Sequence, residues 1–233
     1  YSLKKSSNYV TSHQRMAVTN YLANKENERC IPMFGTEIFV IHSQDSRRDL
    51  ETNTCSVAIK ETTSISNTGN LPSVLKVCVG ARVMMTLNLN LSDRLINGLT
   101  GTVMYIDITQ QVMRNSNLLR GRIFVKFDDP NAGNSLKDSR LRDVYKHCVP
   151  ITAVTATFPY RYGSKTITVQ RKQFPLILAH AMTIHKSQGS TLEYMLGDLD
   201  GTTEKGPNCA SVRPGQLYTC LLYTSDAADD VAS

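Results

Sequence analysis

The chain has 233 residues, with 41% hydrophobic and 20% charged side chains and a formal net charge of +6 at pH 7. This length and composition are typical of a soluble globular protein with one large domain or two small ones. They speak against a protein built on membrane helices, because no apolar run approaches the ~20 residues that a spanning helix needs. The positive charge favours a polyanionic partner weakly and carries no information about fold.

The cysteines are scattered and form no C-x-x-C pair. This spacing predicts neither a zinc site nor a disulfide framework, and it fits a reducing compartment. We therefore expect core thiols at all six positions: Cys30, Cys55, Cys78, Cys148, Cys209 and Cys220.

The chain begins at Tyr1, without methionine and without an apolar signal segment, so we expect it to be part of something longer. The first predicted element is an amphipathic helix within residues 9–25. Thr11 or Ser12 would cap this helix. Its inward face would carry three apolar residues, Met16, Ala17 and Leu22.

Residues 38–42 are β-branched and aromatic and predict a strand. The chain then turns polar over residues 43–70, which are rich in Ser, Thr, Asn and Asp. The charge cluster at 47–49 (Arg, Arg, Asp) lies inside this stretch. We expect these residues to form a solvated loop.

Short strands separated by turns follow, with no helical pattern. Apolar residues alternate over 77–85 as in a half-buried strand, with a bulge or bend at Gly80. Asn97 and Gly98 predict a tight turn, and with Gly101 they are more plausible as turn formers than as ligands. Arg82 could contact phosphate or be an outward solvated charge. Further strands are expected at 101–106, 121–127, 149–151 and 166–169, with a loop at 128–133. The pattern favours a small β-barrel.

The most informative stretch is 174–192. Residues 176–182 are almost continuously apolar, which predicts one strand buried on both faces, as in a parallel sheet covered by helices. The strand ends in T-I-H-K-S-Q-G at 183–189. Ligands bind just outside the carboxyl ends of strands in open α/β sheets. Hydroxyl, imidazole and ammonium groups in this position suit phosphate.

Two stretches carry a resemblance to a known family. T-I-H-K-S-Q-G-S-T-L at 183–192 resembles motif V of superfamily-one DNA helicases of the RecD-like branch, especially the Pif-type (petite integration frequency) family and its Helitron relatives. L-P-S-V-L-K-x-x-V-G-A-R-V-M-x-T-x-N and S-D-x-L-x-N-G-x-T-G-T-V at 71–103 resemble the SH3-like insert of the same helicases, which presents a hairpin beside the exiting strand. Residues 9–25 resemble motif IV loosely, through Thr11, Val18 and Asn20.

The resemblance implies roles for individual residues. Motif V places one side on the single-strand backbone, which implies DNA contacts by Thr183, His185, Lys186 and Ser187. Its other side faces the nucleotide cleft, which implies a nucleotide-side relay by Gln188 and Gly189. Residues 215–219 resemble the start of motif VI, through Gln216 and Tyr218. The chain departs from the family there, before the arginine that reaches the γ-phosphate.

Residues 220–233, which begin C-L-L-Y-T-S-D-A-A-D-D, resemble an in-frame translation of a transposase-type sequencing adapter. We exclude them from fold reasoning as an artefactual tail. The alternative is a genuine, divergent C-terminal segment.

No complete catalytic centre is expected in this chain. It contains no G-x-x-x-x-G-K-[ST] phosphate loop and no Asp-Glu pair for Mg²⁺. It also contains no metal-spaced His/Cys set, so we expect no metal site. ATP and Mg²⁺ are therefore cofactors of a parent protein, with ligands that lie mostly outside this chain.

The expected fold class is α/β. The resemblance implies a second RecA-like domain of the P-loop NTPase type, incomplete, over residues 1–70 and 172–219. A small SH3-like β-barrel insert with connecting strands would occupy 71–171. The missing N-terminal RecA-like domain of the same protein would be its partner, together with single-stranded DNA.

The implied function is the C-terminal part of an ATP-dependent 5′-to-3′ DNA helicase, active in DNA repair, recombination and telomere maintenance, and inactive as an ATPase in this piece. The implied location is nuclear, with mitochondria as the alternative. A second hypothesis is a non-motor nucleic-acid-binding module from a decayed mobile-element helicase. A third is an unrelated α/β domain with accidental motif matches.

Overall fold

The computed structural model describes residues 14–17, 19–47, 55–56, 65–108, 121–138, 145–162, 165–183 and 195–197. The chain divides into two compact units. Unit 1 comprises the residues up to Gly35 together with those from Leu178 onward, and unit 2 comprises Thr36 to Ile177. The domain boundaries expected from the sequence, at 70 and 171, stay a prediction.

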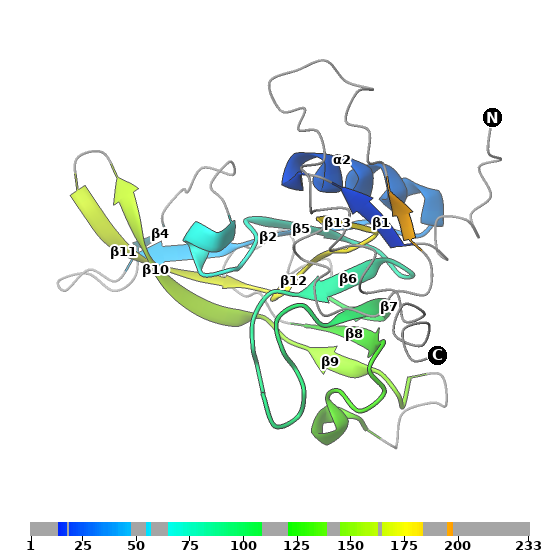
Figure 1. The fold of residues 1–233 in the computed structure, drawn as a ribbon. Coiled ribbons are helices and arrows are strands. Elements are labelled where there is room, and N and C mark those ends of the chain that lie inside the picture. Colours follow the sequence, from blue (N-terminus) through cyan, green and yellow to red (C-terminus); the bar gives the residue numbers. More distant parts are fainter. Residues whose placement is uncertain are drawn as a thin grey trace, which may run out of the picture. The chain divides into compact units, whose positions relative to one another are not determined.

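Unit 1 contains a parallel three-stranded sheet in the order β13-β1-β14, made of Ala181–Thr183, Gln14–Ala17 and Met195–Gly197. Helix α2, Asn20–Cys30, follows β1 and packs on β13 (Figure 1). A 3-10 helix, η1, continues it over Ile31–Phe34. The apolar contact between helix and sheet is made by Ala17, Ala23, Ala181 and Leu22.

The prediction of a helix capped at Thr11 or Ser12 was wrong. Met16 and Ala17, expected on a helix face, are buried in strand β1. Thr19 caps the helix instead: its backbone is extended (φ −125°, ψ 155°) and its hydroxyl accepts a hydrogen bond from the Leu22 N–H at 3.3 Å. Pairing with two strands, one on each edge, overrides the local helical pattern of residues 14–17.

Unit 2 contains a five-stranded sheet in the order β12-β6-β7-β8-β9. The pairs β6–β7, β7–β8 and β8–β9 are antiparallel. These five strands are Leu176–Leu178, Arg82–Met85, Thr100–Asp107, Arg122–Phe127 and Val149–Ile151. A 3-10 helix, η3, lies at Asn134–Leu136 between β8 and β9. The predicted strands at 101–106, 121–127 and 149–151 and the loop at 128–133 are confirmed.

The predicted strand over 77–85 is two strands. Val74–Val77 forms β5, which pairs antiparallel with β2, Phe39–His42, as predicted for 38–42. A turn with Gly80 at φ 90° then separates β5 from β6, which confirms the predicted bend. Val79, expected inside, is 36% exposed because it lies in that turn rather than in a ladder.

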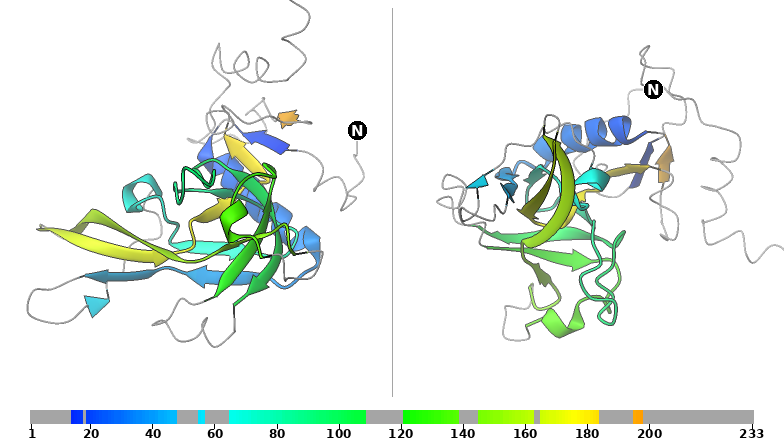
Figure 2. Two further views of the ribbon diagram at one scale, coloured as in Figure 1. Left: turned by 90° about the horizontal axis from the view of Figure 1, so that it is seen from below. Right: turned by 90° about the vertical axis from the view of Figure 1, so that its left-hand side faces the viewer.

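A further sheet of unit 2 has four strands in the order β10-β11-β3-β4. Strands β10 (Val154–Tyr162) and β11 (Lys165–Gln173) form a long twisted antiparallel ribbon (Figures 1 and 2). β11 contains the predicted strand 166–169, whereas β10 was not predicted. The polar stretch 43–70, expected to be a loop, contributes β3 (Gln44–Arg47), β4 (Cys55–Ser56) and the 3-10 helix η2 (Ile65–Thr68).

A buried ion pair fixes β3 in this sheet. The Arg171 guanidinium on β11 donates to both carboxylate oxygens of Asp45 on β3, at 2.6 and 2.7 Å, and its side chain is 1% exposed. It also donates to the Leu71 carbonyl at 3.2 Å and lies 5.6 Å from the centre of the Phe158 ring. One arginine therefore links β3, β10, β11 and the segment before β5.

We predict that Asp45→Ala destabilises the chain strongly, because it leaves the Arg171 charge buried without its partner. The expected loss in the free energy of unfolding is about 3–5 kcal/mol. Denaturant unfolding of the chain measures this loss.

Asp107→Ala is the matched control, because it removes the carboxylate of the exposed Arg122–Asp107 pair. It should cost less than about 1 kcal/mol. Equal losses in the two variants would contradict a structural role for the buried pair.

Candidate functional site

The predicted site lies at the carboxyl edge of the parallel sheet of unit 1. The register pairs Ala17 of β1 with Thr183 of β13, and Met16 of β1 with Gly197 of β14, so the three strands end together. The arrows of β13, β1 and β14 lie side by side in Figure 1. This edge is where ligands bind in open α/β sheets.

Thr183 is the one residue of the predicted tip that falls within the described residues. It is the last residue of β13, its side chain is buried (6% exposed), and it lies beside Ala17. The other predicted DNA contacts and relay residues lie outside the described residues: His185, Lys186, Ser187, Gln188 and Gly189. The motif VI residues Gln216 and Tyr218 also lie outside them.

Helix α2 begins at this same edge. Only residues 18 and 19 separate the end of β1 from the first helical residue, Asn20. Helix N-termini carry a partial positive charge and free backbone N–H groups. The carboxyl edge of the sheet therefore combines strand ends and a helix N-terminus, both of which suit an anionic ligand.

The predicted single strand 176–182 is interrupted, and this prediction was wrong. β12 ends at Leu178 in the five-stranded sheet, and β13 begins at Ala181 in the parallel sheet. Ala179 and His180 connect them and are both buried. A continuous apolar run cannot reveal such a break, because both strands are buried and share one hydrophobic pattern.

Asn27 of α2 satisfies the backbone at this break. Its side-chain amide donates to the carbonyl oxygens of Ala181 at 2.9 Å and Leu178 at 3.3 Å, and its carbonyl accepts from the Ala181 N–H at 2.7 Å. Asn27 is buried. Sequence reasoning missed this residue; the available signal was a polar side chain on the inner face of a helix, three to four residues from Ala23 and Cys30.

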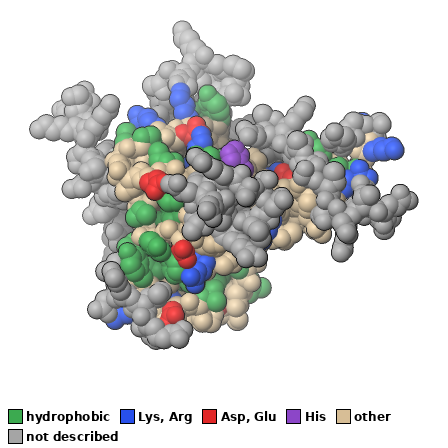
Figure 3. All heavy atoms as spheres, turned by 180° about the vertical axis from the view of Figure 1, so that it is seen from behind, with side chains coloured by type: hydrophobic (Ala, Val, Ile, Leu, Met, Phe, Trp, Pro, Cys, Tyr) green, Lys and Arg blue, Asp and Glu red, His purple; other side chains and the backbone are tan. Residues whose placement is uncertain are grey.

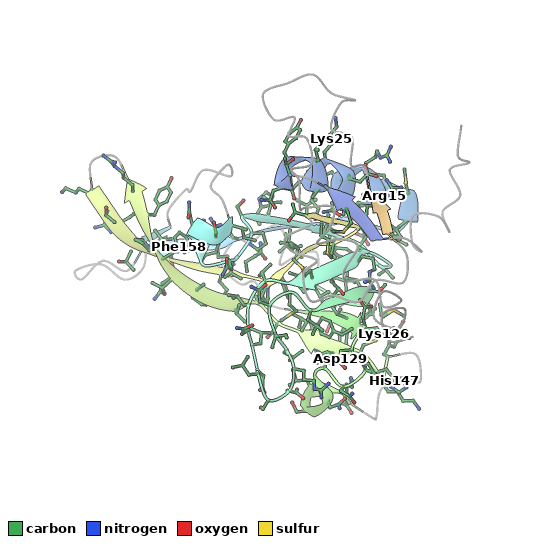
Figure 4. The ribbon with its side chains drawn as sticks, viewed as in Figure 1. Arg15, Lys25, Lys126, Asp129, His147 and Phe158 are labelled. Carbon is green, nitrogen blue, oxygen red and sulfur yellow. The ribbon has the colours of Figure 1, made fainter. Side chains whose placement is uncertain are left out.

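A second set of contacts fixes β1 against the same connection. The Arg15 N–H donates to the His180 carbonyl at 3.0 Å, and the His180 ring lies 5.1 Å from the ring of Phe34. The Arg15 side chain forms an ion pair with Glu26 of α2, which also accepts from Arg29 at 2.7 Å. Arg15 therefore ties β1 to α2 (Figure 4).

The thiol of Cys30 at the end of α2 is a core group. Burial raises the pKa of this thiol, and the nearby Arg15 and Arg29 charges oppose the rise only in part. Burial likewise raises the pKa values of Cys78 and Cys148. The expectation of core thiols is confirmed for these three residues. The burial of Cys55, Cys209 and Cys220 lies outside what the structure describes.

Arg82, which the sequence left open, is held in an ion pair. Its guanidinium donates to the two carboxylate oxygens of Asp128 at 2.6 and 2.7 Å, and the Thr100 hydroxyl donates to the same carboxylate at 2.5 Å. Gly98 has φ 92° in the predicted tight turn, where the Leu99 N–H bonds the Ile96 carbonyl.

The prediction that Gly101 forms a turn was wrong. It lies in β7, where an added Cβ would come within 2.7 Å of the Lys126 carbonyl oxygen. β7 and β8 approach each other so closely here that the position has no room for a side chain.

The sheet that contains β10 and β11 has a polar outer face. Directly opposite residues of antiparallel strands point to the same side. The register therefore gathers on one face Thr155, Thr157, Pro159, Arg161, Thr166, Thr168, Gln170, Lys172, Gln44 and Ser46. No carboxylate occurs in this set, and residues 149–192 contain no Asp or Glu at all. That gap in acidic residues is the sequence signal that could have identified this face.

Within the described ranges, no three or more His, Cys, Asp or Glu side chains are grouped so that they could hold a metal ion. The one α-helix in those ranges is too short and too polar to cross a membrane.

Comparison with known proteins finds relatives among DNA helicases. The chain is 30% identical over 176 residues to the ATP-dependent DNA helicase PIF7 of Trypanosoma brucei brucei, a match that covers 69% of this chain and 16% of the relative. It is 29% identical over 201 residues to the ATP-dependent DNA helicase Pif1 of Bdellovibrio bacteriovorus, covering 85% of this chain and 34% of the relative. The chain is also 28% identical over 183 residues to an uncharacterized protein, 030L of Invertebrate iridescent virus 6. This match covers 66% of this chain and 32% of the relative.

The fold is similar to solved helicase structures. The Pif1 helicase from Candida albicans matches with a TM-score of 0.60 and 24% identity, over 96% of this chain and 45% of that one. A Bacteroides Pif1 bound to single-stranded DNA matches with a TM-score of 0.57 and 21% identity, over 96% of this chain and 40% of that one. No family model matches the chain. The chain spans between 16% and 34% of the curated relatives' length.

We predict that Asn27→Ala loosens the β12–β13 connection. The change leaves one backbone N–H and two carbonyl groups without their partner, at an expected cost of about 2–3 kcal/mol in the free energy of unfolding. Amide hydrogen exchange at Ala181 should accelerate more than exchange in β7 and β8.

Tyr21→Ala on the same helix is the control, because Tyr21 is 52% exposed. This variant should leave exchange at Ala181 unchanged. Unaltered exchange at Ala181 in the Asn27 variant would show that the amide does not hold the connection.

Proposed function

Because this chain is a relative of the Pif-type ATP-dependent DNA helicases, we propose that it is the C-terminal part of an enzyme that couples ATP hydrolysis to 5′-to-3′ unwinding of DNA. One observation carries the proposal. Thr183 ends a strand at the carboxyl edge of a parallel sheet, and the sequence continues from that edge with I-H-K-S-Q-G. The motif thus follows the position at which the α/β architecture binds its ligands.

The proposed roles follow the motif. His185, Lys186 and Ser187, with Thr183 at the strand end, contact the backbone of single-stranded DNA. Gln188 and Gly189 link the bound DNA strand to the nucleotide cleft. Gln216 and Tyr218 begin motif VI. The helix N-terminus beside the strand ends supports this assignment, because it adds partial positive charge at the same edge.

ATP and Mg²⁺ belong to the proposed parent enzyme. The sequence lacks a phosphate loop and an acidic Mg²⁺ pair, so an N-terminal RecA-like domain would supply most of the ligands for both. This chain would contribute one wall of the nucleotide cleft, at the Gln188–Gly189 side. The remaining partner is single-stranded DNA.

We also propose that unit 2 contains the SH3-like barrel insert of the family. Its five short strands, with antiparallel pairing from β6 through β9, support this proposal, as does their position between β1–α2 and β13 in the chain. Unit 1 would then be the interrupted second RecA-like domain. The tail 220–233 would belong to neither domain.

The ribbon of β10 and β11 is our candidate for the hairpin that the insert presents to the strand. Its outer face offers threonine hydroxyls, the Gln170 amide, Arg161 and Lys172, and no carboxylate. Hydroxyl, amide and cationic groups are the side chains that contact phosphates in nucleic-acid interfaces. The absence of negative charge removes repulsion from a DNA backbone.

The proposed biological context is DNA repair, recombination and telomere maintenance, in the nucleus or in mitochondria. The alternative function is a nucleic-acid-binding module that has lost its motor role in a mobile element. The two differ in the parent reading frame: a P-loop lysine and an acidic Mg²⁺ ligand upstream favour the helicase, and their absence favours the binding module.

We predict that the purified chain does not hydrolyse ATP, because the groups that cradle the phosphates and Mg²⁺ are not in it. Phosphate release with Mg²⁺ and single-stranded DNA should equal the no-protein blank. Magnesium-dependent turnover above that blank would contradict the division of the site between two domains.

We predict that the double variant H185A/K186A binds single-stranded DNA more weakly and with a shallower salt dependence. Each lost phosphate contact should reduce the slope of log K against log salt by about one. Fluorescence anisotropy of a labelled oligonucleotide over a salt series measures both quantities.

K25A is a control for this variant, because it removes a lysine of α2 outside the proposed DNA contacts. Binding by H185A/K186A that matches the wild type at every salt concentration would remove the motif from the interface. The reading of the chain as an unrelated α/β domain would then gain support.

A further inference from the structure

The five-stranded sheet of unit 2 has aromatic side chains on its outer face. The β7–β8 register pairs Tyr105 with Phe124, and the β8–β9 register pairs Phe124 with Pro150, so these three lie on one side. The alternate residues of β8 point to the other side, toward the core, where Ile123, Val125 and Phe127 are buried. The outer face is therefore distinct from the core of the unit.

The aromatic residues form a supported cluster, which we call the aromatic platform: Tyr105, Phe124 and Tyr145. The ring centre of Tyr105 lies 5.7 Å from that of Phe124 and 5.6 Å from that of Tyr145. Phe124 is buried, whereas Tyr105 is 46% exposed. Two neighbours thus hold the Tyr105 ring in place while nearly half of its surface stays open to solvent.

Cationic groups flank the platform. Lys126 is exposed, lies opposite Thr102 and shares the outer face with Phe124, two residues away on β8. Arg122 lies 5.4 Å from the centre of the Phe124 ring and pairs at 3.2 Å with Asp107, which the register places on this face. Arg82, opposite Thr102 on the same face, pairs with Asp128 at 2.6 Å. His147 is exposed two residues after Tyr145. Within the described residues, the two arginines of this face are paired with carboxylates, and Lys126 adds a further positive charge.

The views agree with this description. Hydrophobic side chains reach the surface over the part of the molecule that contains β7, β8 and β9, with basic and acidic side chains beside them (Figure 3). Lys126 and His147 are labelled at the same end of this sheet in Figure 4.

We propose that the aromatic platform is a second binding surface for single-stranded DNA, at which an unpaired base stacks on Tyr105 and Lys126 contacts the adjoining phosphate. An exposed aromatic ring beside cations on a sheet face provides the two interactions that non-specific single-strand binding uses. Every base has a π-face, so the site needs no sequence preference. This inference rests on the proposed function, because it assumes that the chain binds single-stranded DNA.

The test compares oligothymidylate of about 12 nucleotides with an abasic oligomer of the same length, on the full chain. Wild-type chain should prefer the oligomer that carries bases. Tyr105→Ala should weaken binding to oligothymidylate about 5- to 100-fold and leave the abasic oligomer unaffected, because only stacking is lost. Tyr105→Phe should bind like the wild type, since it keeps the ring.

Two controls separate this site from motif V. Leu91→Ala, which removes an exposed apolar side chain of unit 2 outside both sites, should change neither affinity. H185A/K186A should weaken both oligomers alike, because it removes phosphate contacts. An unchanged Tyr105→Ala beside a weakened H185A/K186A overturns the platform and leaves the proposed function standing; the reverse result overturns the role of motif V alone.

Three other outcomes also overturn the platform. In the first, Tyr105→Ala loses affinity equally for both oligomers. In the second, Tyr105→Phe loses affinity for oligothymidylate. In the third, the wild-type chain binds the two oligomers equally well. If Tyr105→Ala does not fold, photo-crosslinking of wild-type chain to 5-iododeoxyuridine-substituted oligothymidylate decides. Crosslinks on the peptides that contain Tyr105 or Tyr145 support the platform, and their absence from both rejects it.

Discussion

The buried amide of Asn27 is the contact on which the placement of the candidate site depends. The chain leaves one sheet at Leu178 and enters another at Ala181, and the backbone between them cannot use a single ladder. An amide offers a donor and an acceptor together, so one side chain of α2 bonds both the carbonyl and the N–H of Ala181. An aliphatic residue there would leave buried polar groups unbonded. The carboxyl end of β13, from which the T-I-H-K run continues, is thereby fixed to α2 and β1.

Several carboxylates of unit 2 form ion pairs with arginines, whereas lysines lie on the exposed sheet faces. Arginines hold the carboxylates in four described pairs: Arg82–Asp128, Arg94–Asp129, Arg122–Asp107 and Arg171–Asp45. These four carboxylates are thus neutralised by neighbouring arginines. The exposed faces of the two larger sheets keep lysines such as Lys126 and Lys172, and the ribbon face has no acid at all. A surface of this kind attracts a polyanion along much of its length.

Local signals could predict the α/β class and most strands of unit 2. The β-branched run at 38–42, the turn at Gly98 and the apolar run before Phe127 act within a few residues, and the structure follows them. Contacts distant in sequence could not be predicted. Strand β1 exists because segments some 165 to 180 residues later flank it, and Asp45 is ordered by an arginine 126 residues away. At the site, the carboxyl edge was predictable from the apolar run, whereas the break and Asn27 were not, because both arise from packing.

The position of the inserted unit has a consequence for biosynthesis. β1 and α2 leave the ribosome before unit 2, but both strands that pair with β1 come after the whole of unit 2. Unit 2 is contiguous and can form its own sheets as soon as it is made. The parallel sheet must instead wait with its apolar residues Met16 and Ala17 unprotected. The segment of β1 thus has no partner strands until residues 181–183 and 195–197 are made, and the parallel sheet is the last of the described sheets to be completed.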